Sequence, residues 1–179
     1  TAFLWLTDPK PSLDGHILIN PLDENSFMGL ICFKNGSRTR ERIRDDCAEG
    51  NWKLFDELLE STPRGNFGNI GLYYDFKETY PVISGDFRYN KFDSEVARFS
   101  KEVEVRACIE GQFLRLRVHA EKLGFSIGQE TRVLATGGAS ANKAIIQVLA
   151  DVFNAPVILQ QKADSANMGS ALMAKYGKY

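Results

Sequence analysis

A short strand-like run followed by two adjacent glycines and a helix-like stretch is the clearest place for ligand chemistry in this sequence. The run is Val133–Thr136, the glycines are Gly137 and Gly138, and the helical pattern begins near Ser140. Glycine lacks a Cβ, so the main chain can turn sharply and a flat ligand can lie against it. Free N–H groups and the positive dipole of a helix N-terminus suit phosphate or ribose oxygens. The residues alone leave two interpretations open, a nucleotide contact and an ordinary tight connection.

The sequence around this turn differs from the common phosphate-binding motifs. The third glycine of G-x-G-x-x-G is missing, and the next strand ends at Gln160, where a Rossmann fold would carry an acidic residue. No Gly-Lys-Ser/Thr follows, so the turn is not a P-loop. Asn142, expected in the first helical turn, can offer a ligand both a donor and an acceptor. The glycine-rich stretch 65–71 has the spacing of neither motif and is interpreted as a structural loop.

Trp52 is the second candidate for a ligand contact. An indole at the edge of a nucleotide cleft can cover the face of a base, which contributes about 1–3 kcal/mol. The alternative is a core anchor, because Trp52, Phe55 and Leu59 recur at helical spacing.

Other reactive side chains form no recognisable catalytic or metal-binding set. The sequence has no G-x-S-x-G motif, and its two histidines stand far apart, without a nearby cysteine partner. The three cysteines lack C-x-x-C spacing and are expected to be buried or half-buried reduced thiols, which indicates a cytoplasmic protein. A net charge of −1 provides no field for nucleic acid or an anionic membrane. The polar turn at 78–81 has no role that its residues suggest.

The first half of the chain must supply the elements that support these candidates. Its pattern predicts a β-meander, then a tight turn at Asn35–Gly36 and two helices, the first capped by Ser37 and the second by Asn51. Residues 61–100 give no clear pattern beyond a possible strand at 70–76. The expected strands are 3–6, 16–20 and 27–33, and the expected helices are 37–48 and 51–59.

The second half predicts a regular alternation of helices and strands. A stripe of apolar residues at i, i+3, i+4 spacing marks a helix over 102–123, where Ala107 and Gly111 would admit another backbone closely. Strand 132–136, helix 140–154 and strand 156–160 follow, and Asp164 or Ser165 caps a last helix. This order predicts one α/β domain, a ribonuclease-H-like (actin-type ATPase) lobe with a mixed sheet and helices on both faces. Thr1 lies inside an apolar run, which is typical of a piece of a longer chain; a processed start is the alternative.

Segments spread along the chain resemble the C-terminal lobe of the FGGY carbohydrate kinases. The Gly-Gly turn with the helix after it is the most specific part of this resemblance. The matching segments are 3–6, 32–37, 105–107, 110–113, 135–140, 147–153, 165–166 and 169–171.

The resemblance implies how this chain would take part in catalysis. In such kinases ATP lies between two lobes with Mg²⁺, and a sugar hydroxyl attacks the γ-phosphate. Residues 1–179 would be the nucleotide-binding lobe, with the phosphate loop just before Thr1. The general-base Asp and most sugar contacts would belong to an N-terminal lobe that this chain lacks, so it holds no catalytic residue and is expected to be inactive alone. The implied nucleotide contacts are Trp52, Gly137, Gly138, Ala139 and Asn142.

The overall likeness is to the branch of the family that converts D-xylulose to D-xylulose 5-phosphate. Glycerol, gluconate and ribulose stay open as substrates, because the residues that select the sugar would lie outside this chain. The competing hypothesis is a non-catalytic actin-like module that binds a nucleotide or a protein partner and transfers nothing.

Overall fold

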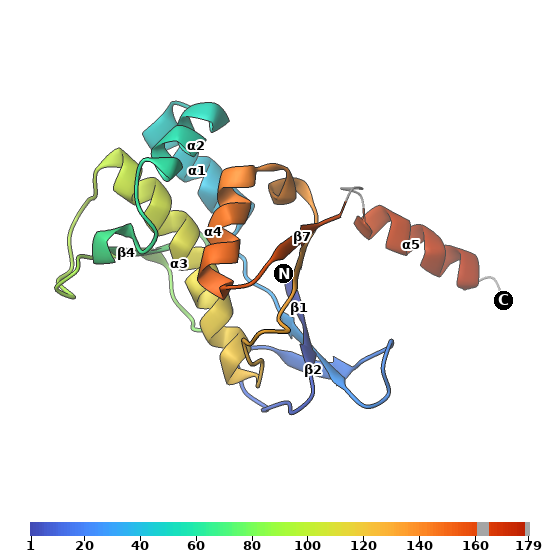
Figure 1. Cartoon of the computed structure of the whole chain (residues 1–179). Helices are drawn as coiled ribbons and strands as arrows, with labels where there is room; N and C mark the ends of the chain where they lie inside the picture. Colours follow the sequence, from blue (N-terminus) through green and yellow to red (C-terminus); the bar gives the residue numbers. More distant parts are fainter. Residues whose placement is uncertain (161–164, 178–179) are drawn as a thin grey trace.

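A long helix, α3, lies at the centre of the described residues, 1–160 and 165–177, of this computed structural model (Figure 1). Helices α1, α2 and α4 and strand β4 all pack against it. The helices are α1 (Ser37–Ala48), α2 (Trp52–Glu60), α3 (Lys101–Lys122), α4 (Lys143–Phe153) and α5 (Ser165–Tyr176), with short 3₁₀ turns η1 (Asn66–Gly68) and η2 (Gly138–Ala141). The strands are β1 (Ala2–Leu6), β2 (His16–Ile19), β3 (Phe27–Ile31), β4 (Ile70–Tyr74), β5 (Gly85–Tyr89), β6 (Val133–Ala135) and β7 (Val157–Leu159).

The first half of α3 is buried on every side, not along one stripe as the sequence pattern predicted. All eight residues from Glu104 to Gly111 are buried, and three of them carry charges. Buried charges destabilise a fold unless they are paired, and these are. Arg106 donates to Glu110 at 3.0 Å and to the Thr62 hydroxyl at 2.6 Å. The polar residues that interrupt the apolar pattern of α3 are therefore part of the interior.

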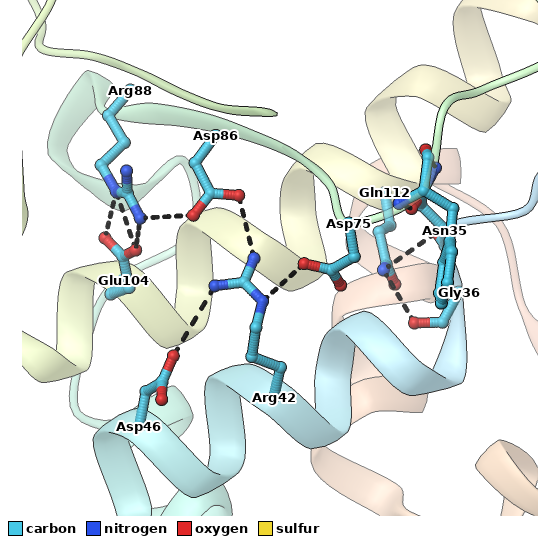
Figure 2. A network of polar contacts seen from close by, with 10 residues as sticks. Asn35, Gly36, Arg42, Asp46, Asp75, Asp86, Arg88, Glu104 and Gln112 are labelled. Atoms are coloured by element: carbon cyan, nitrogen blue, oxygen red, sulfur yellow. Dashed lines mark hydrogen bonds and ion pairs between the residues drawn. The ribbon is translucent and has the colours of Figure 1, made fainter. Parts of the chain in front are cut away.

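Figure 2 shows the ion pairs that connect α3 with α1 and with the β4–β5 hairpin. Arg88 of β5 donates to Glu104 at 2.8 and 3.0 Å and to Asp86 at 3.0 Å. Arg42 of α1 pairs with Asp86 at 2.9 Å and with Asp75 at 2.6 Å. The possible strand at 70–76 is thus confirmed as β4, and a chain of alternating charges joins the β4–β5 hairpin to α1 and α3.

The first three strands do not form the expected meander. Their order is β1–β3–β2, with β3 antiparallel to both neighbours. A meander would need a tight loop after β1, whereas residues 7–15 form a longer connection that reaches the far side of β3. The N–H of Lys10 donates to the carbonyl of Leu123 at 2.9 Å and holds this connection at the end of α3. Since β1 and β2 flank the same strand, β3 is the centre of the sheet.

The strands also do not join into one mixed sheet. They form a three-stranded sheet, the antiparallel β4–β5 pair and the parallel β6–β7 pair. Strands β6 and β7 have three residues each and pair only with one another among the described residues. Leu134 and Ile158 of this pair remain largely exposed. The α/β class is confirmed, whereas the continuous sheet is wrong because no described hydrogen bonds link the short C-terminal strands to β1.

Gly111 admits another backbone closely, as its spacing predicted, and that backbone is β4. A Cβ at this position would collide with the carbonyl oxygen of Gly71 on β4. Tyr73 of β4 and Cys108 of α3 belong to the same cluster of buried side chains. The distance between helix and strand is therefore set by direct contact between the main chains of Gly111 and Gly71.

We expect Gly111→Ala to lower the free energy of unfolding by about 1–3 kcal/mol, because the added methyl group overpacks a rigid contact. Gly128→Ala is the matched control, since a Cβ there meets nothing within 4 Å. Urea denaturation of both variants measures the difference. Equal stability of the two would show that α3 and β4 are not in direct backbone contact.

The side chain of Asn35 is buried and forms hydrogen bonds to a distant loop. The expected tight turn with positive φ is wrong, since Gly36 has φ −124° and is itself the N-cap of α1 in place of Ser37. The Asn35 amide donates to the carbonyl of Phe76 at 2.8 Å and to Glu78 at 3.1 Å, and it accepts from the N–H of Phe76 at 2.9 Å. One side chain thus joins the start of α1 to the loop after β4.

Glu78 is the carboxylate at the centre of this contact, and its side chain is fully buried. Burial acts to raise its pKa, but N–H donors from Lys34, Thr79 and Asn35 and the charge of Arg115 outweigh that effect. The pKa of Glu78 is therefore lower than usual. Glu78 thus anchors the polar turn at 78–81 to the interior, while Thr79, Tyr80 and Pro81 remain exposed.

The lowered pKa of Glu78 predicts a loss of stability in acid. The unfolded chain, with the higher pKa, takes up the proton first, so this contribution is complete above the usual value of 4.5 and falls as the pH drops below it. Urea midpoints measured from about pH 7 down to about pH 3 should fall, and Glu78→Gln should flatten that dependence. An unchanged slope in Glu78→Gln would assign the acid sensitivity to other carboxylates.

Candidate functional site

The Gly-Gly turn leaves its main chain open to the surroundings. Strand β6 ends at Ala135, and Gly137 follows with φ 84°, a left-handed conformation that favours glycine. The hydroxyl of Ser140 donates to the carbonyl of Gly137 at 2.6 Å and closes the turn. A Cβ built on Gly137 or Gly138 would meet nothing within 4 Å. The glycines are therefore not required by packing inside this chain, which leaves room for a flat ligand beside them.

The helix after the turn begins later than its sequence pattern predicted. Residues 138–141, including Ala139, form the 3₁₀ turn η2, and Asn142 is the N-cap of α4 and not a residue of its first turn. The Asn142 side chain accepts from the N–H of Ile145 at 3.0 Å. Its amide group donates to Asp56 at 2.6 Å. The Asn142 side chain therefore uses one acceptor and one donor position in bonds within the protein. One acceptor and one donor position remain for a ligand.

Trp52 lies at the surface, beside the core positions of α2. Its ring packs edge-to-face on Phe55, with the centroids 5.2 Å apart, while the core positions of α2 are Phe55 and Leu59. The guanidinium of Arg44 lies 4.8 Å from the centre of the indole, and Asp45 holds Arg44 at 2.8 Å. The residue is still 37% exposed. Trp52 is thus a surface residue whose indole is held by Phe55 and Arg44, and it is not a core anchor.

The contact between Asn142 and Asp56 brings the two candidate regions together. Asp56 follows Trp52 by four residues, so both lie on the same side of α2. The N-terminal end of α4 lies beside α2, as Figure 1 shows. Of the five nucleotide contacts that the sequence implies, Gly137, Gly138, Ala139 and Asn142 lie within one short segment, and Trp52 is joined to them through Asp56.

Sequence reasoning missed Asp56 and Arg44, which hold Asn142 and Trp52 in place. The spacing of Asp56 from Trp52 was the available signal, but it gave no partner for the carboxylate. A groove of about 500 Å³ lies elsewhere, between β4, the turn at Tyr80 and the second half of α3. It is lined mainly by apolar side chains and contains none of the five candidates.

Neither a metal-binding cluster nor a membrane-spanning helix is found where the structure describes the chain. No group of three or more His, Cys, Asp or Glu side chains could hold a metal ion in residues 1–160 and 165–177. No helix in these ranges is long and apolar enough to cross a bilayer. Cys47 and Cys108 are buried free thiols, while Cys32 is free and exposed, unlike the sequence expectation. Asp164, one of the two expected caps of α5, lies outside the described residues; Ser165, the other, is the first residue of α5.

Comparison with known proteins places the chain among sugar kinases. Residues 1–177 match the model of the FGGY family of carbohydrate kinases, C-terminal domain. A xylulose kinase of Rattus norvegicus is 52% identical over 177 residues, which are 99% of this chain and 33% of that protein. The chain therefore spans about a third of the length of the curated relatives that it matches.

Two solved structures share the fold at lower sequence identity. The ligand-bound xylulose kinase from Lactobacillus acidophilus aligns with 97% of this chain and 35% of its own, with a TM-score of 0.74 and 21% identity. A Plasmodium falciparum glycerol kinase with ADP aligns with 96% of this chain and 35% of its own, with a TM-score of 0.64 and 14% identity. These structures share the fold, and the family match along nearly the whole sequence shows that the chain belongs to the FGGY family of carbohydrate kinases, as its C-terminal domain.

Proposed function

We propose that this chain is the nucleotide-binding lobe of an ATP-dependent kinase that converts D-xylulose to D-xylulose 5-phosphate. The observation that carries the proposal is the open Gly137–Gly138 turn, joined through Asn142 and Asp56 to the helix of Trp52. The similarity of the whole chain to xylulose kinases supports the choice of sugar. The plasmodial structure with ADP supports an adenine nucleotide.

The residues of this chain would bind and orient adenosine. The exposed part of the Trp52 ring would stack on the base, while Arg44 lies over the indole and supports it. The uncrowded main chain at Gly138 would lie against the base or ribose, and the remaining amide donor and acceptor of Asn142 would add polar contacts. ATP supplies the phosphoryl group, and orientation of the reacting groups accounts for much of the rate in such transfers.

The other parts of the reaction would lie outside this chain. The described residues contain no cluster of acidic side chains that fits Mg²⁺, so an ion carried by the nucleotide would be held by its phosphates and by the preceding lobe. The base that accepts the proton of the sugar hydroxyl, and most sugar contacts, would belong to that lobe too. Closure of the two lobes would exclude water from the transferred phosphate.

A chimera tests the proposal. In the rat relative, this chain would replace the matching segment, which is 33% of that protein. We expect ATP-dependent phosphorylation of D-xylulose by the chimera and none by this chain alone, with ADP bound by both. D-ribulose, glycerol and gluconate serve as competing substrates. Turnover by this chain alone would refute the assignment of the catalytic base, and nucleotide binding without turnover in the chimera would favour a non-catalytic module.

A further inference from the structure

The contact between Asp56 and Asn142 is the one described side-chain hydrogen bond that joins the two halves of the proposed adenosine site. Asn142 lies at the N-terminus of α4, directly after the turn η2, and Asp56 lies on α2, four residues after Trp52. The donor is the Asn142 amide nitrogen, 2.6 Å from Asp56 Oδ1. Both residues are half-buried, which limits their exchange of this bond with water.

This bond also fixes which way the Asn142 amide points. Its oxygen accepts from the N–H of Ile145 at 3.0 Å, and its nitrogen donates to Asp56. A flipped amide would set the nitrogen against the Ile145 N–H and the oxygen against the Asp56 carboxylate, so both contacts would become repulsive. Asp56 and the N–H of Ile145 therefore determine together where the free N–H and the free oxygen lone pair of Asn142 lie.

We propose that Asp56 is a positioning residue of the nucleotide site, which orients the Asn142 amide and keeps the helix of Trp52 at a fixed place beside the Gly-Gly turn. This inference rests on the proposed function. Asp56 acts through α2 and through Asn142, whose amide donates to its Oδ1. Nothing in the capping of α2 requires it, because Asn51 supplies the N-cap bonds of that helix.

Substitutions at Asp56 separate positioning from folding. Asp56→Ala removes the acceptor, whereas Asp56→Asn retains an amide oxygen that can accept the same bond. Glu57→Gln is the matched control, because Glu57 is the next residue of α2, is exposed and pairs only loosely with Lys53 at 3.9 Å. Each variant is made in this chain and in the chimera with the rat relative.

The expected result is a loss of nucleotide affinity that the conservative variant rescues. Asp56→Ala should weaken ADP binding by about tenfold in calorimetry, a change equivalent to about 1.4 kcal/mol, while Asp56→Asn and Glu57→Gln stay near the wild type. In a Trp5→Phe background Trp52 is the single tryptophan, and quenching of its fluorescence by ADP should report the same shift. In the chimera the KM for ATP should rise about tenfold, with kcat and the KM for xylulose unchanged.

The outcomes distinguish this inference from the proposed function. If the wild-type chain binds ADP and folded Asp56→Ala binds it equally well, the positioning role is overturned and the nucleotide site stands. If the wild-type chain and the chimera bind no ADP, both proposals fail. Thermal melting shows whether each variant is folded; if Asp56→Ala is not, Asp56→Ser, whose hydroxyl is too short to reach Asn142, replaces it with the same expected loss.

Discussion

Gly138→Val is expected to abolish nucleotide binding while leaving the fold intact. The position is exposed, a Cβ there meets nothing within 4 Å, and its backbone does not require glycine, since only Gly137 of the pair has positive φ. A branched side chain would instead occupy the space in which the proposed ligand lies against the main chain. We expect the affinity for ADP to fall by about a hundredfold or more, equivalent to at least about 2.7 kcal/mol.

The control for this variant is Gly128→Val, at another glycine where an added Cβ meets open space. Calorimetry with ADP and thermal melting of both variants give affinity and stability separately. A Gly138→Val chain that melts like the control and still binds ADP at wild-type affinity would remove the Gly-Gly turn from the nucleotide site.

Arg115→Met is expected to destabilise the fold more than Gly111→Ala does. The guanidinium of Arg115, 3.2 Å from the buried carboxylate of Glu78, also lies 3.9 Å from the centre of the Phe33 ring. Methionine retains much of the aliphatic packing but leaves Glu78 without its cation. Removal of one partner from a buried pair costs about 3–5 kcal/mol. We expect the lower end of that range, because three N–H donors still bond to Glu78.

The dependence of this loss on pH identifies its origin. Without Arg115 the folded-state pKa of Glu78 should rise, so the stability gap between variant and wild type should narrow as acid protonates Glu78 in both. Urea denaturation at neutral and acidic pH measures the gap, and Arg132→Met, at a half-exposed arginine, is the control. A gap that stays constant with pH would point to lost packing on Phe33 and not to the ion pair.

The sequence predicted most of the helices and strands but not how the strands pair. Helix α1 spans the predicted residues, and α4 begins three residues late because Asn142 caps it. Strand order depends on the path of the 7–15 connection, which a backbone bond from Lys10 to Leu123 holds at the end of α3. Local periodicity contains no information about such a contact, so the meander and the continuous sheet were both wrong.

The hydrophobic pattern also failed where charges are buried. The apolar stripe of α3 left out Glu104, Arg106 and Glu110, yet each of them is buried. Glu104 pairs with Arg88 of another element, and Arg106 pairs with Glu110 one turn along the same helix. Burial of this kind depends on tertiary structure and cannot be read from residue type. The open main chain and the aromatic ring of the site are local properties, which the sequence could indicate. How the two are placed relative to one another depends on the Asp56–Asn142 contact, which the sequence could not indicate.

The burial of the first half of α3 should control how its backbone amides exchange with solvent. The backbone amides between Val105 and Gly111 are surrounded by three helices and a strand, so no small fluctuation brings solvent to them. Their hydrogens should exchange with deuterium only when the entire domain comes apart. The slowest-exchanging amides would then report the global free energy of unfolding directly, whereas those of the open Gly-Gly turn would exchange without any unfolding.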